Sequence, residues 1–90
     1  MSALKDLERN VHQFLVHLPH VRKVEVEAFV NAQGHKHVKT VTFVNDDSRD
    51  TRFRVYRAEQ LLIEKHENVN FEFSCTTLKE RHEQRSLGTP

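Results

Sequence analysis

Apolar residues recur at spacings of three and four along the first part of the chain. They are Leu4, Leu7, Val11, Phe14, Leu15 and Leu18. At 100° per residue these positions fall within an arc of about 100°, which predicts an amphipathic helix. Ser2 can cap the start of this helix. Pro19 predicts its end at Leu18, because the residue before a proline disfavours helical backbone.

The pattern then changes to alternation, which is typical of half-buried strands. Apolar Val24, Val26, Ala28 and Val30 alternate with Lys23, Glu25, Glu27 and Phe29. Residues 31–34 supply a turn, in which Gly34 can take a positive φ. Residues 38–44 are the returning strand of the predicted hairpin. Both faces of this second strand are partly apolar, which favours a more central place in the sheet than the first strand has.

The segment 45–73 fixes the predicted architecture. Residues 45–48, NDDS, end the strand and offer several oxygens that can cap a helix. Residues 49–66 then have two interpretations: one long helix, or a strand over 51–56 followed by a short helix. We favour the long helix. A final strand follows, in which Val69, Phe71, Phe73 and Cys75 alternate with polar residues.

The order helix–strand–strand–helix–strand predicts an α+β fold. It is a two-layer sandwich with one three-stranded mixed sheet and both helices on one face. A right-handed crossover places the last strand parallel to the second one, and it can lie beside either the first or the second strand. Residues 1–78 are the predicted domain, and 79–90 are polar and expected to be a frayed tail. The expected main core residues are Leu7, Phe14, Leu18, Val26, Phe71 and Phe73.

Composition narrows the class of protein. Ninety residues, 37% hydrophobic and 30% charged, fit one globular domain with a thin core. The net charge of +1 implies neither nucleic acid nor an acidic membrane as a partner. The single cysteine excludes an internal disulfide, and no apolar run approaches the ~20 residues of a membrane span. We therefore expect a cytoplasmic protein with no membrane partner.

Seven histidines raise the question of a metal site: His12, His17, His20, His35, His37, His66 and His82. Zinc needs three or four ligands that converge. Two pairs stand out, but His17/His20 and His35/His37 lie at opposite ends of the first strand, roughly 30 Å apart at ~3.3 Å per residue. The sequence therefore predicts solvated histidines, with no metal and no cofactor.

A polar row interrupts the apolar side of the second helix. Arg52, Glu59 and His66 follow one another at a spacing of seven, in line between two apolar rows. Because an unpaired buried charge is costly, such a row must be paired, partly solvated or functional. One interpretation is a contact for a ligand or partner, with Glu59 accepting and Arg52 donating. The favoured one is a packing seam in which Glu59 bonds to Arg52 or to the backbone.

Four arginines near the start of this helix suggest phosphate or nucleic-acid binding, since guanidinium groups suit phosphates. They are Arg49, Arg52, Arg54 and Arg57. An ion pair between Asp50 and Arg54 is expected from their spacing of four. The outward sheet positions carry three glutamates with Phe29 as the only aromatic, which is not a stacking platform for bases. Nucleic acid is therefore possible but less favoured than solvated, internally paired arginines.

Catalytic motifs are absent from the sequence. Cys75 shares its face with two phenylalanines, where a thiol is inert. Two glycines are too few for a glycine-rich phosphate loop. We therefore do not expect an enzyme, and catalysis with Glu59 as general acid–base is the last alternative.

The favoured function is a small protein-interaction module that self-associates, as a homodimer, through the open sheet face or an edge strand. A sheet covered on one face leaves the other face and at least one edge free. The open face would combine Phe29 with Glu25, Glu27, Glu72 and threonines, or with Val38 and Val44, depending on register. An apolar patch rimmed by carboxylates is typical of an interaction surface. The alternative is phosphate or nucleic-acid binding through the four arginines.

Overall fold

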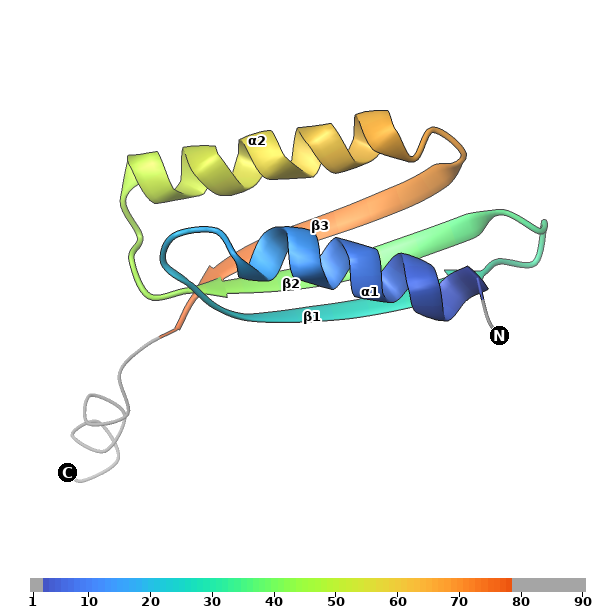
Figure 1. Cartoon of the computed structure of the whole chain (residues 1–90), viewed down its shortest axis with the longest axis horizontal. Helices are drawn as coiled ribbons and strands as arrows, with labels where there is room; N and C mark the ends of the chain where they lie inside the picture. The colour runs from blue at the N-terminus through green and yellow to red at the C-terminus, as the bar shows by residue number, and fades with distance from the viewer. Residues whose placement is uncertain (1–2, 79–90) are drawn as a thin grey trace, which may run out of the picture.

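The computed structural model describes residues 3–78 and has two layers, a three-stranded sheet and two helices (Figure 1). The elements are α1 (Ala3–Val16), β1 (Val21–Val30), β2 (Lys36–Val44), α2 (Arg49–Lys65) and β3 (Val69–Thr77). This is the α+β fold and the element order that the sequence predicts. The cap expected at Ser2 and the tail expected at 79–90 lie outside the described residues.

The first helix ends two residues earlier than predicted. It stops at Val16, and Leu18 donates its backbone N–H to the Leu15 carbonyl over 3.2 Å. His20 then takes a left-handed backbone with φ 68°, which is uncommon outside glycine. This tight turn lets β1 begin at Val21, two residues before Lys23, the first residue of the predicted strand.

The central strand of the sheet is β2. It pairs antiparallel with β1 and parallel with β3, so the order is β1-β2-β3. The predicted parallel pairing and central second strand are confirmed, and the open choice is settled in favour of β3 beside β2. In the hairpin turn Asn31 accepts two backbone N–H groups on its side-chain oxygen, and Gly34 has φ 84°.

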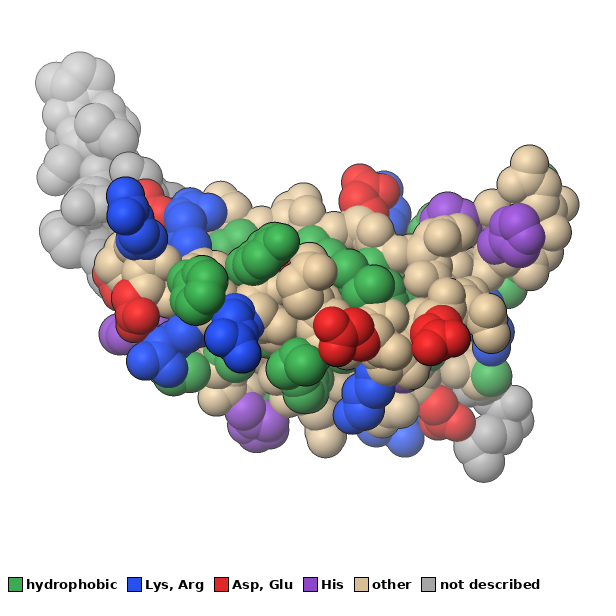
Figure 2. Space-filling model, turned by 90° about the horizontal axis from the view of Figure 1, so that it is seen from above, with side chains coloured by type: hydrophobic (Ala, Val, Ile, Leu, Met, Phe, Trp, Pro, Cys, Tyr) green, Lys and Arg blue, Asp and Glu red, His purple; other side chains and the backbone are tan. Residues whose placement is uncertain are grey.

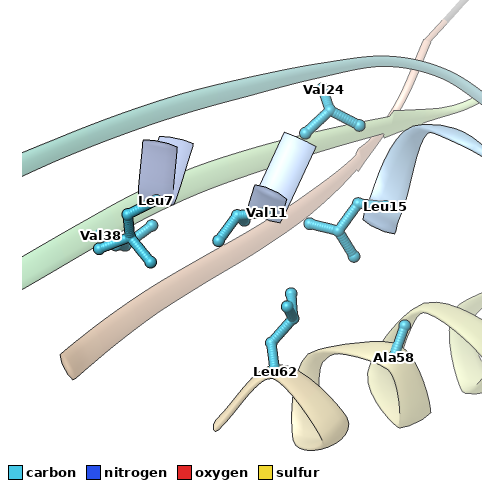
Figure 3. Close-up of a cluster of buried hydrophobic side chains, with 7 residues drawn as sticks. All are labelled: Leu7, Val11, Leu15, Val24, Val38, Ala58 and Leu62. Atoms are coloured by element: carbon cyan, nitrogen blue, oxygen red, sulfur yellow. The ribbon is translucent and has the colours of Figure 1, made fainter. Parts of the chain in front are cut away.

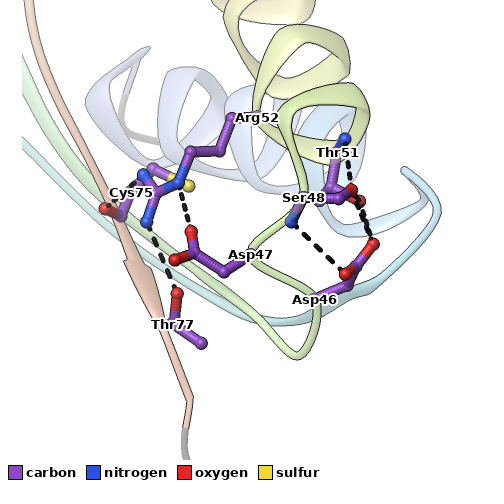
Figure 4. Close-up of polar contacts among 7 residues, drawn as sticks. All are labelled: Asp46, Asp47, Ser48, Thr51, Arg52, Cys75 and Thr77. Carbon is purple, nitrogen blue, oxygen red and sulfur yellow. Dashed lines mark hydrogen bonds and ion pairs between the residues drawn. The ribbon is translucent and has the colours of Figure 1, made fainter.

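The start of α2 is fixed by a network of caps (Figure 4). The Ser48 hydroxyl accepts the backbone N–H of Thr51. The Asp46 carboxylate accepts both hydroxyls, over 2.8 Å from Ser48 and 2.6 Å from Thr51. These bonds lower the pKa of Asp46 below its ordinary value. The favoured long helix is confirmed, and the strand alternative at 51–56 is wrong because this capping starts the helix at Arg49.

Seven buried apolar side chains form the core cluster between the helices and the sheet (Figure 3): Leu7, Val11, Leu15, Val24, Val38, Ala58 and Leu62. Of the expected core residues only Leu7 is buried, with 8% of its surface exposed. The others pack around this cluster and remain partly exposed. Phe71 and Phe73 do so because β3 is an edge strand, and their rings stack on each other 5.1 Å apart.

Candidate interaction surface

The open face of the sheet carries both apolar residues and charged ones. The register places Phe29, Val41 and Phe43 there, and it turns Val38 and Val44 to the helix side. The Lys23 ammonium lies 5.5 Å from the centre of the Phe43 ring, and His37 stacks on Phe29 at 5.4 Å. Charged residues of both signs share this face with the apolar ones, and Glu25, Glu27, Lys39 and Glu72 are among them.

The two edges of the sheet differ in charge. The β1 edge carries Arg22, Lys23, Glu25 and Glu27, whereas β3, VNFEFSCTT, carries Glu72 alone. Charged side chains are a common way in which natural edge strands avoid pairing with another chain. The β3 edge lacks this protection, so it is the better candidate for pairing.

One end of β3 is covered by an arginine from α2 (Figure 4). Arg52 donates to the Cys75 carbonyl over 3.5 Å and to the Thr77 hydroxyl over 3.4 Å. It also pairs with the Asp47 carboxylate, which raises the pKa of Arg52 and lowers that of Asp47. This leaves residues 69–74 as the uncovered length of the strand.

Apolar side chains of α2 lie along the same edge. Tyr56 and Ile63 follow Arg52 at helical spacings of four and eleven, so they lie on the β3 side of α2. They are 56% and 40% exposed. Half-buried Phe71 and Phe73 lie on the side of β3 that faces α2. We call these four residues the β3 border. Figure 2 shows hydrophobic side chains exposed over α2, with basic ones gathered near its start.

The three residues of the polar row of α2, Arg52, Glu59 and His66, do not contact one common partner. Glu59 is 9% exposed, and burial raises the pKa of its carboxyl to about 7. Of the two partners expected for Glu59, Arg52 or the backbone, Arg52 is excluded, because its guanidinium binds Asp47 and β3 instead. His66 caps the far end of the helix and packs against Phe71, with ring centres 6.1 Å apart.

The four arginines at the start of α2 differ in their contacts. Arg54 pairs with Asp50 over 3.0 Å, as the spacing predicts. Arg57 lies over the Phe53 ring at 5.8 Å, and Arg52 is held at β3. Arg49 is exposed at the start of the helix. Arg52, Arg54 and Arg57 therefore each have a different partner.

A groove that the sequence analysis missed lies between α1 and α2. It measures about 410 Å³, and its apolar walls include Phe14, Leu18, Phe53 and Leu61. Arg54 and Arg57 lie beside them. The signal in the sequence was the exposed apolar pair at positions 53 and 61, which falls outside the buried side of α2. Glu59 does not line this groove.

Metal-ligating side chains do not gather in residues 3–78: no three of His, Cys, Asp and Glu there can hold one ion. His35 precedes β2, and the His37 ring lies 2.9 Å from the Asn31 amide nitrogen. Burial raises the pKa of the half-buried Cys75 thiol, which disfavours the reactive thiolate. Within the same residues no helix is long and apolar enough to cross a bilayer.

No protein-family model matches the chain, and no curated protein matches its sequence. Solved structures of the MamM C-terminal domain share the fold. One MamM variant aligns with a TM-score of 0.67 and 13% identity, over 87% of this chain and 100% of that chain. A nickel form of another variant aligns with 0.62 and 11%, over 83% and 99%. This likeness shows the fold alone: a two-layer α+β domain.

Proposed function

We propose that this chain is a protein-interaction module that forms a homodimer through the β3 edge. One observation carries the proposal: β3 is an edge strand with a single charged residue, flanked by exposed apolar side chains of α2. Unprotected edges of this kind accept a further strand, whose backbone groups pair with those of the edge.

A second copy suits this edge because a twofold axis makes the interface self-complementary. An axis perpendicular to the sheet sets the two β3 strands antiparallel, about 4.8 Å apart, in one six-stranded sheet. It also puts the two α2 helices side by side on the same face, so Tyr56 and Ile63 of each copy meet those of the other. Packing of this kind removes the apolar β3 border from water.

The open sheet face is the weaker of the two surfaces considered for self-association. Its apolar residues lie under or beside charged ones, such as Lys23 over Phe43. Burying those charges would cost free energy unless each met a partner. The β3 border carries apolar side chains without such cover, which favours the edge.

Three lysine substitutions separate the surfaces. Ile63→Lys places a charge in the proposed interface and should weaken dimerisation at least tenfold. Leu61→Lys is the matched control, because Leu61 is 49% exposed on the α1 side of the same helix. Val41→Lys tests the open face. Sedimentation velocity over a wide concentration range gives the association constant of each variant.

The expected result is a dimer that Ile63→Lys disrupts and that the other two variants keep. A chain that stays monomeric at every concentration would contradict the proposal. So would a dimer lost in Val41→Lys but retained in Ile63→Lys, which would assign the interface to the open face.

A further inference from the structure

The groove between α1 and α2 is separate from the β3 border. It lies on the opposite flank of α2, where Leu18, in the turn after α1, lines it together with Ala58 and Leu61. Phe53 and Leu61 expose 54% and 49% of their surface there. The volume of about 410 Å³ falls in the range of small-molecule sites, roughly 300–1,000 Å³.

The charged side chains that line the groove, Asp50, Arg54 and Arg57, carry a net positive charge. Asp50 is the one carboxylate in the lining, and its oxygen is bound to Arg54 over 3.0 Å. Arg57 has no carboxylate partner within residues 3–78, and its guanidinium lies over the Phe53 ring at 5.8 Å. An aromatic face beneath a guanidinium holds it in place by cation–π attraction and leaves its N–H edge available.

We propose that this groove binds a small carboxylate with an apolar body, such as a fatty acid of medium chain length. The apolar chain lies between the helices against Phe14, Leu18 and Leu61. The carboxylate accepts hydrogen bonds from Arg57, whose planar group matches the two carboxylate oxygens. Apolar walls alone would take any hydrocarbon, so the guanidinium gives the preference for an anion.

Decanoate is the probe that tests this site, used below its aggregation concentration with the isotope-labelled 90-residue chain. Amide chemical shifts should move in a saturable, one-to-one manner. The largest shifts should occur at Phe14, Leu18, Phe53 and Leu61. Decanol, which has the chain without the charge, should bind more weakly, and acetate, which lacks the chain, should not bind.

Two matched arginine variants locate the carboxylate. Arg57→Gln should weaken decanoate binding about tenfold or more, the loss expected for a hydrogen bond to a charged group, and should leave decanol binding unchanged. Arg49→Gln makes the same change of charge on the same helix outside the groove, and it should bind decanoate like the parent.

Three results would overturn the proposal. Equal weakening in Arg49→Gln and Arg57→Gln would show a general charge effect. Equal affinity for decanol and decanoate would remove the role of the anion. Shifts that appear only once decanoate aggregates would make this flank of α2 a lipid-surface contact. Because the groove and the β3 border use opposite flanks, failure here leaves the proposed dimer untouched.

Discussion

At the scale of single residues, Glu59 of α2 carries a carboxyl group in a buried position, where the residue is 9% exposed. The spacing of seven along the sequence predicts only that Glu59 lies in line with Arg52 on the helix. Spacing along one helix could not show that Asp47, in the preceding loop, would take the Arg52 guanidinium. The Glu59 carboxyl is partly removed from water, and this desolvation raises its pKa from 4.5 to about 7.

The raised pKa predicts a loss of stability as pH increases. Between about pH 4.5 and 7 the folded protein keeps the Glu59 proton that the unfolded chain has lost, so unfolding becomes easier through that range. The full effect is at most about 3 kcal/mol. Glu59→Gln should remove most of it, as measured by urea denaturation at several pH values. A parent and variant with the same pH dependence would contradict the assignment.

Asp46 and Asp47 act in the opposite direction. Hydrogen bonds lower the pKa of both, so the stability they add is present at neutral pH and is lost as pH falls through their folded-state pKa values. Stability should therefore be greatest at mildly acidic pH. Asp46→Asn should reduce acid sensitivity, and the same denaturation series measures it.

Glu59→Leu is expected to raise stability at neutral pH by about 1 kcal/mol or more, because an apolar side chain suits the buried place better than an ionised one. The favoured interpretation of the sequence predicts a loss of stability instead, because a leucine at position 59 would leave Arg52 without its partner. That pairing is absent, so leucine strands no partner. A lower denaturation midpoint for this variant would mean that the carboxylate has a stabilising partner.

At the scale of elements, hydrophobic periodicity predicted both helices, all three strands and their order along the chain, but not the position of β3 in the sheet. Periodicity shows which side of an element is apolar, but it does not show what covers that side. Phe71 and Phe73 were therefore expected in the core, although β3 lies at the edge and leaves them partly exposed. The turn at His20 was also missed, because a left-handed histidine leaves no pattern in the sequence.

Leu15 and Phe71 differ in burial, so truncating each to alanine should lower the free energy of unfolding by a different amount. Leu15 is fully buried between the layers, so Leu15→Ala should cost about 3–5 kcal/mol. Phe71→Ala should cost about half as much, despite its larger ring, because water already reaches one side. Thermal unfolding of the two variants measures the difference. Equal or greater loss in Phe71→Ala would mean that β3 is covered more fully in solution.

At the scale of the whole molecule, one layer of helices on a three-stranded sheet leaves large apolar side chains of α2 exposed, among them Tyr56 and Ile63. The sequence predicted that surfaces would remain open, and it predicted self-association. It could not choose among the surfaces, because that choice depends on the pairing register and on which edge carries charge. With the register and the edge charges known, we propose the β3 edge as the place where a second copy pairs.

Backbone hydrogen exchange at several protein concentrations tests that claim most directly. If two copies pair through β3, amides within residues 69–74 that point away from β2 should exchange more slowly as concentration rises, because they become hydrogen bonded. Amides on the outer side of β1 should not change. Ile63→Lys should abolish the concentration dependence. Protection in β3 that is the same at all concentrations, or that increases in β1 instead, would contradict the account.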